Sequence, residues 1–287
     1  MKSIKIGKML AVFLLVITAS CDILDKKPLD MISDDVVWDD PTLVDAYLVS
    51  QYSEMTVVKM DQQQKAGGGW GFKGSFQFVI DMTAETTQPA WVLAGVTGYR
   101  TGGLNIDGGL MEYWETSYTI NRRLNELIER LPNSTNEPEY IESRVAEARF
   151  LRAFNYFSMA KRYGGVPLVT KAIPMDAPAE EMYPVRNTEQ EVYDFVISEI
   201  NDIEEKLNGL PQDYGRATQG AALALKCRAA LYAGSVAQFG KVEKNGLVGI
   251  PQTAAQGYYQ AAYDAAKKIQ NLGKYALYNE EADKVVS

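Results

Sequence analysis

The sequence of 287 residues contains no histidine and only two cysteines, Cys21 and Cys227. Histidine is the commonest general base and the commonest metal ligand in proteins, so its absence removes a conventional catalytic triad and most zinc sites. Two thiols are also too few to build a structural zinc site. We therefore expect no catalytic residues, no bound metal and no cofactor.

Basic residues are also scarce relative to acidic ones. The chain has 29 Lys and Arg against 37 Asp and Glu, which gives a formal net charge of −8. Such a surface repels phosphate backbones, so we expect no nucleic-acid partner. Adjacent acids such as Glu180-Glu181 do not form the pair across a cleft that glycoside hydrolysis needs. A hydrolase whose paired carboxylates are not evident from the sequence stays an alternative.

The first 21 residues have the pattern of an export signal. Three lysines precede the apolar run Met9–Ile17, which is too short to cross a bilayer as a helix. Small residues at positions 18–20 then lead to Cys21, which predicts a signal peptide over residues 1–20 and acylation of Cys21. The alternative is a plain secretory signal with a chance cysteine. Cys227 lies in an alanine-rich stretch and is expected to be a small core residue.

Apolar residues at helical spacing dominate the rest of the chain, with one interruption. From about residue 59 to residue 109, repeated glycines break any long helix and predict an irregular excursion. Thr188 and Glu191 form a predicted capping box at the start of one helix. A short polar tether is expected over residues 22–35. The first predicted helix begins at Pro41. Further helices are predicted over residues 114–131, 138–163, 188–207, 218–239 and 258–272.

These helices contain an internal repeat. The interval from Arg152-Ala153 to Tyr163-Gly164 recurs from Arg228-Ala229 to Phe239-Gly240, and the two copies lie 76 residues apart. Each unit is predicted to be an antiparallel helix pair, as in tetratricopeptide-like repeats, so the fold class is mainly α. An irregular bundle is the alternative. The last helix is expected to be the first member of a third pair, which makes the sequence look incomplete.

Aromatic side chains are the best candidates for ligand binding. Trp70, Trp91 and Tyr99 lie in the glycine-rich excursion and are the better candidates for an exposed platform that binds sugar rings or peptide side chains. Burial of each ring in the protein is the alternative. Trp38 and Trp114 are instead predicted to pack in the core.

Four segments in order along the chain carry a resemblance to a known family. They are CDILDKKPLDMISDDVVWDDPTLVDAYL, EARFLRAFNYFSMAKRYGGVPLV, RNTEQEVYDFVISEINDIEEKL and GRATQGAALALKCRAALYAG. The chain resembles the SusD/RagB family of surface lipoproteins of Bacteroidota, and residues 21–287 are similar to the N-terminal helical-repeat region of that family, without its C-terminal half.

The resemblance implies a non-enzymatic lipoprotein of the outer membrane, facing the cell surface and anchored by acyl chains on Cys21. It would capture oligosaccharide, or less often peptide, and hand it to a SusC-like TonB-dependent transporter. The alternative is a helical-repeat scaffold that docks a membrane partner and has no small-molecule site of its own.

Overall fold

The computed structural model describes residues 34–55, 64–65, 72–73, 113–207 and 215–276. The predictions for Cys21, Trp70, Trp91 and Tyr99 and for the signal peptide fall outside these residues. The described helices are α2 (Asp34–Asp39), α3 (Pro41–Glu54), α6 (Trp114–Arg130), α7 (Pro138–Tyr163), α8 (Ala179–Met182), α9 (Glu189–Ile203), α10 (Gln219–Phe239) and α11 (Ala255–Asn271). Short 3-10 turns occupy Leu131–Asn133, Glu205–Leu207 and Gln252–Ala254.

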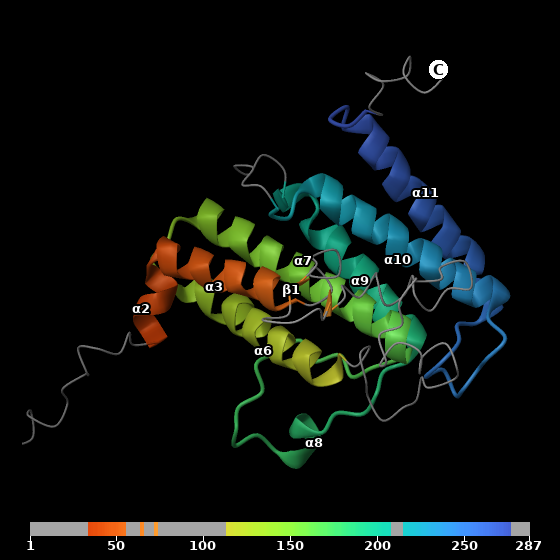
Figure 1. Ribbon diagram of the computed structural model, residues 1–287, viewed down its shortest axis with the longest axis horizontal. Helices are drawn as coiled ribbons and strands as arrows, with labels where there is room; N and C mark the ends of the chain where they lie inside the picture. The colour runs from red at the N-terminus through yellow and green to blue at the C-terminus, as the bar shows by residue number, and fades with distance from the viewer. Residues whose placement is uncertain (1–33, 56–63, 66–71, 74–112, 208–214, 277–287) are drawn as a thin grey trace, which may run out of the picture.

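The mainly α prediction is confirmed, because the long helices lie side by side in a stack that runs from α3 to α11 (Figure 1). One two-stranded antiparallel pair accompanies them, in which β1 (Gln64–Lys65) pairs with β2 (Phe72–Lys73). No helix in the described part of the chain is both long enough and apolar enough to cross a membrane.

The predicted helix pairs are present as two hairpins, α6–α7 and α9–α10. In the first hairpin, the amide of Tyr113 at the start of α6 donates to the hydroxyl of Tyr163 at the end of α7, so the helices run antiparallel. Helix α11 then lies along α10, where a side chain at Gly220 or Gly234 would collide with tyrosine rings of the last described segment. Small residues therefore allow these backbones to approach closely.

Helix ends follow the local signals in the sequence. Helix α7 begins with Pro138 at its first position and ends before Gly164, whose φ of 69° is a conformation that glycine adopts readily. The capping box at the start of α9 is confirmed, since the Thr188 hydroxyl accepts from the amide of Glu191 and the Glu191 carboxylate accepts from the amide of Thr188.

Removal of this cap should destabilise the protein measurably. We expect Thr188→Ala to lower the free energy of unfolding by about 1 kcal/mol, because one helix amide loses its acceptor. Urea unfolding followed by circular dichroism measures the change. Thr119→Ala is the control, since Thr119 is an exposed residue inside a helix whose hydroxyl bonds only to the carbonyl of Glu115, and it should shift stability by less than about 0.5 kcal/mol.

Two predictions need correction, one about the end of the polar tether and one about the burial of Cys227. The polar tether was expected to continue to Asp35, but α2 already begins at Asp34. The buried Trp38 ring follows at the end of this helix and packs edge-on against Tyr47, at 5.3 Å between ring centroids, which fixes this part of the chain. Cys227 is only partly buried, because it lies about 200° around α10 from the buried positions 225 and 229.

Candidate functional site

The segment that follows α7 forms one wall of a groove. Residues 167–173, which we call the strap, run along the α6–α7 hairpin without joining a sheet. Side chains of the two helices satisfy the strap backbone instead. These bonds join Tyr118 to the carbonyl of Pro167, Asn125 to those of Val169 and Lys171, Arg152 to that of Thr170, Arg122 to that of Ile173, and Glu129 to the amide of Ala172.

Tyr156 is one of the fully buried residues that hold the strap. Its hydroxyl donates to the carbonyl of Val169 at 3.0 Å and accepts from the amide of the same residue at 2.8 Å. Burial raises the pKa of Tyr156 to about 12, so the hydroxyl stays protonated and can do both. The strap is therefore positioned by the helices and not by its own secondary structure.

A groove with a volume of about 630 Å³ lies between α6 and the segment from the strap to Pro184; we call it the aromatic groove. Its lining residues combine rings with polar groups, and they are Trp114, Glu115, Tyr118, Thr119, Asn121, Arg122, Pro167, Val169, Lys171, Ile173, Met182, Tyr183 and Pro184. The short helix α8, which leads into the last three of these residues, projects on a long loop beside α6 (Figure 1).

Two of the rings in the aromatic groove are fixed by the helix. Trp114 and Tyr118 are one turn apart on α6, with ring centroids 5.2 Å apart. On another side the Trp114 ring contacts Tyr163 edge-on, at 5.3 Å, and the Arg186 guanidinium lies 6.0 Å from its centroid. Burial raises the pKa of Tyr118, so its hydroxyl remains a hydrogen-bond donor.

The third ring is the most accessible. Tyr183 is 79% exposed, and Met182 beside it is 41% exposed. A half-buried pair together with an accessible ring provides flat apolar faces with polar edges, which suits the stacking of sugar rings. Near these rings the cations Arg122 and Lys171 pair with the carboxylates of the protein itself, at 3.4 Å to Glu126 and 2.5 Å to Glu181.

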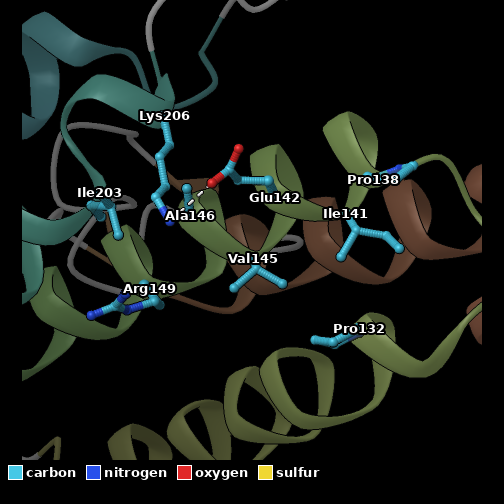
Figure 2. A pocket seen from close by; sticks show the side chains of 9 residues that line it. All are labelled: Pro132, Pro138, Ile141, Glu142, Val145, Ala146, Arg149, Ile203 and Lys206. Carbon is cyan, nitrogen blue, oxygen red and sulfur yellow. Dashed lines mark ion pairs between the residues drawn. The ribbon is translucent and has the colours of Figure 1, made fainter.

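A second groove, of about 370 Å³, lies between α7 and the end of α9, and it has a different character (Figure 2). Its lining residues are Pro132, Pro138, Ile141, Glu142, Val145, Ala146, Arg149, Ile203 and Lys206. The ammonium of Lys206 reaches across to the carboxylate of Glu142 at 3.0 Å (Figure 2). The walls are aliphatic and charged and carry no aromatic ring, so this groove offers no stacking platform.

The sequence identified only part of the aromatic groove. Trp114 was predicted to be a core residue, but it is half-buried and serves both as a core contact and as a groove wall. Trp114 and Tyr118 are four residues apart, directly after the glycine-rich excursion, and this spacing could have predicted that the two rings lie together on one face of a helix. Tyr183 lies far along the chain from both, and no local pattern connected it with them.

No group of three or more acidic, cysteine or histidine side chains in the described ranges is arranged to hold a metal ion. The raised pKa values among the tyrosines come mainly from burial, as for Tyr118 and Tyr193.

A family model described as starch-binding and associating with the outer membrane matches residues 22–231. The chain is 38% identical over 101 residues to a SusD-like protein, P38, of Formosa agariphila, a match that covers 35% of this chain and 19% of the relative. It is 25% identical over 205 residues to a SusD-like protein of Bacteroides ovatus, covering 70% of this chain and 35% of the relative.

Solved structures give the same picture of the fold. A SusD-like protein of Bacteroides fragilis matches with a TM-score of 0.58 and 27% identity, over 88% of this chain and 42% of that structure. A laminarin-binding SusD-like protein matches with a TM-score of 0.57 and 21% identity, over 79% of this chain and 43% of that structure. The chain thus spans less than half the length of these relatives.

Proposed function

The chain belongs to the SusD-like family, and from that membership we propose that it captures oligosaccharides at the outer membrane and delivers them to a SusC-like TonB-dependent transporter. Binding would occur without catalysis. In this proposal residues 1–20 are a signal peptide, acylated Cys21 anchors the helical-repeat region 21–287 at the cell surface, and the glycan or a peptide is the cargo.

The observation that carries the carbohydrate proposal is the aromatic groove. Trp114 and Tyr118 are half-buried and packed together on α6, whereas the exposed Tyr183 projects from the loop opposite. Rigid rings reduce the entropy lost on binding, and the neighbouring polar groups supply hydrogen bonds to hydroxyls. Trp70, Trp91 and Tyr99 remain proposed as a further platform.

Tyr183 gives the cleanest test of this site, because a side chain that is 79% exposed can be removed without opening the core. We expect Tyr183→Ala to weaken the binding of a soluble neutral glucan such as laminarin about tenfold, equivalent to about 1.4 kcal/mol, through loss of one stacking face. Isothermal titration calorimetry on the mature chain measures the affinity.

The matched control is Tyr263→Ala on α11, where another exposed tyrosine lies outside the aromatic groove. Its affinity should equal that of the unmodified protein. Equal losses in the two variants would contradict the assignment of the groove. If the unmodified protein binds no member of a glycan panel but still binds a transporter, the scaffold alternative would be supported instead.

A further inference from the structure

Helices α7 and α10 carry the same pair of side chains at the same repeat positions. In α7, Arg152 and Tyr156 together hold the strap, through the carbonyl of Thr170 and both backbone groups of Val169. The Arg152 guanidinium also donates to the carboxylate of Glu199 at 2.7 Å. This pair therefore binds an extended stretch of backbone together with a carboxylate.

In α10 the equivalent pair, Arg228 and Tyr232, lies 76 residues later in the chain and has no such occupant. Arg228 is exposed, whereas Arg152 is 5% exposed. Within the part of the chain that the structure describes, Arg228 has no hydrogen bond or ion pair, and the hydroxyl of Tyr232, a residue 40% exposed, has no hydrogen bond. The two side chains are present without the backbone and carboxylate that their counterparts bind.

The backbone explains why the second position is open. After α7, Gly164 adopts a φ of 69°, and the chain turns back so that Val166 is fully buried. After α10, Gly240 adopts a φ of −60°, and the equivalent Val242 is 67% exposed. The segment that follows returns to the end of the first hairpin, where the carbonyl of Leu247 accepts from the amide of Gly165. No strap therefore forms along α10 in the described structure.

The charge around the open pair favours an acidic occupant. The ammonium of Lys161 lies 4.8 Å from the ring centroid of Phe157 and 5.7 Å from that of Tyr232. Burial, followed by repulsion from Arg228 and Arg162, lowers the pKa of Lys161 to about 8. Like charges held together in this way are stabilised by an added carboxylate, which is the role that Glu199 has beside Arg152.

Apolar side chains continue the same face of α10. Leu231 is 50% exposed and Phe239 is 71% exposed, and both lie within about 60° of Arg228 around the helix axis. A helix face that combines a cation with apolar groups matches a polypeptide better than it matches a small anion, because both the backbone and the side chains of the partner find contacts.

We propose that Arg228 and Tyr232, flanked by Lys161, bind an extended acidic segment of a partner polypeptide, in the way that Arg152 and Tyr156 hold the strap. The Arg228 guanidinium would donate to a backbone carbonyl and a carboxylate of the partner, and Leu231 and Phe239 would cover its apolar side chains. This surface is separate from the aromatic groove, so the proposal does not depend on glycan binding.

A pair of synthetic peptides tests this surface directly. Both copy residues 165–173 and carry a fluorophore; one has the natural lysine, and the other carries Lys171→Glu. Fluorescence anisotropy with the full mature chain at low salt should show the glutamate peptide binding about fivefold more tightly, equivalent to about 1 kcal/mol for one charge contact. Arg228→Glu should reverse this preference, and Tyr232→Phe should weaken the binding of both peptides.

Lys267→Glu is the matched control for Arg228→Glu, because Lys267 is also an exposed cation. It lies 5.7 Å from the ring of Tyr263 on the neighbouring helix α11. This variant should leave the preference unchanged. The proposal is overturned if the unmodified protein fails to bind the glutamate peptide, or if Arg228→Glu and Lys267→Glu alter the preference equally. Arg228→Gln, which should abolish the preference without reversing it, provides a second reading with no added negative charge.

Discussion

Gly165→Ala is expected to lower the free energy of unfolding by about 3 kcal/mol or more, at the upper end of the cost of overpacking. A Cβ atom at this position would lie 2.0 Å from the carbonyl oxygen of Asn187 and 2.9 Å from the amide nitrogen of Glu189. Both atoms belong to backbone at the start of α9, which cannot rotate away as the end of a side chain can. The entry of the chain into the strap and the beginning of the second hairpin would both have to shift.

Urea unfolding of the variant beside the unmodified protein measures this effect. The control is Gly257→Ala, since a Cβ at Gly257 in α11 meets no atom within 4 Å. Alanine is the better helix former by about 1 kcal/mol, so this second variant should be slightly more stable than the original. A Gly165→Ala protein as stable as the Gly257→Ala protein would contradict the close backbone approach.

Glu199→Ala is expected to cost about 3–5 kcal/mol, the range for removing one partner of a buried ion pair. Glu199 is 6% exposed, and its two oxygens accept from Arg149 at 2.6 Å and from Arg152 at 2.7 Å. Without the carboxylate, the guanidinium of Arg152 would remain buried between the hairpins with no negative charge beside it. The loss should appear as a lower urea midpoint.

Asp202→Ala separates this effect from a general loss of negative charge. Asp202 also pairs with Arg149, at 2.9 Å, but its side chain is 58% exposed. Water and salt screen such a pair, so its removal should cost less than about 1 kcal/mol. If the two variants lost equal stability, burial would not be the cause.

The sequence predicted the helical frame well, because each long helix carries its own signals. The limits of α7 could be read from Pro138, from the apolar spacing between, and from Gly164. The strap could not be predicted in this way. Its course depends on side chains such as Asn125 and Tyr156, which lie 44 and 13 residues from the carbonyl of Val169 that they contact, and no local periodicity records such contacts.

The same reasoning explains the outcome for the candidate site. The composition of the sequence pointed to aromatic residues in the glycine-rich stretch, whereas the described groove joins Trp114 on α6 to Tyr183 after α8. A repeat signal of identical residues was also not sufficient to predict burial. Arg152 and Arg228 occupy equivalent positions, but among the described residues only Arg152 meets a carboxylate, that of Glu199 on α9.

Helix α7 has one further consequence for how the molecule holds together. Between Ala146 and Ala160 every residue is buried except Arg149 and Phe154, which are partly so, and α3, α6, α9 and α10 all contact this helix. It is therefore the central helix of the described fold, and helices pack against it on both sides. If the backbone were cut near the exposed Met175, the fragments before and after the cut should stay associated under native conditions. The buried contacts of α7 with α9 and α10 hold them together, and these contacts do not require a continuous chain.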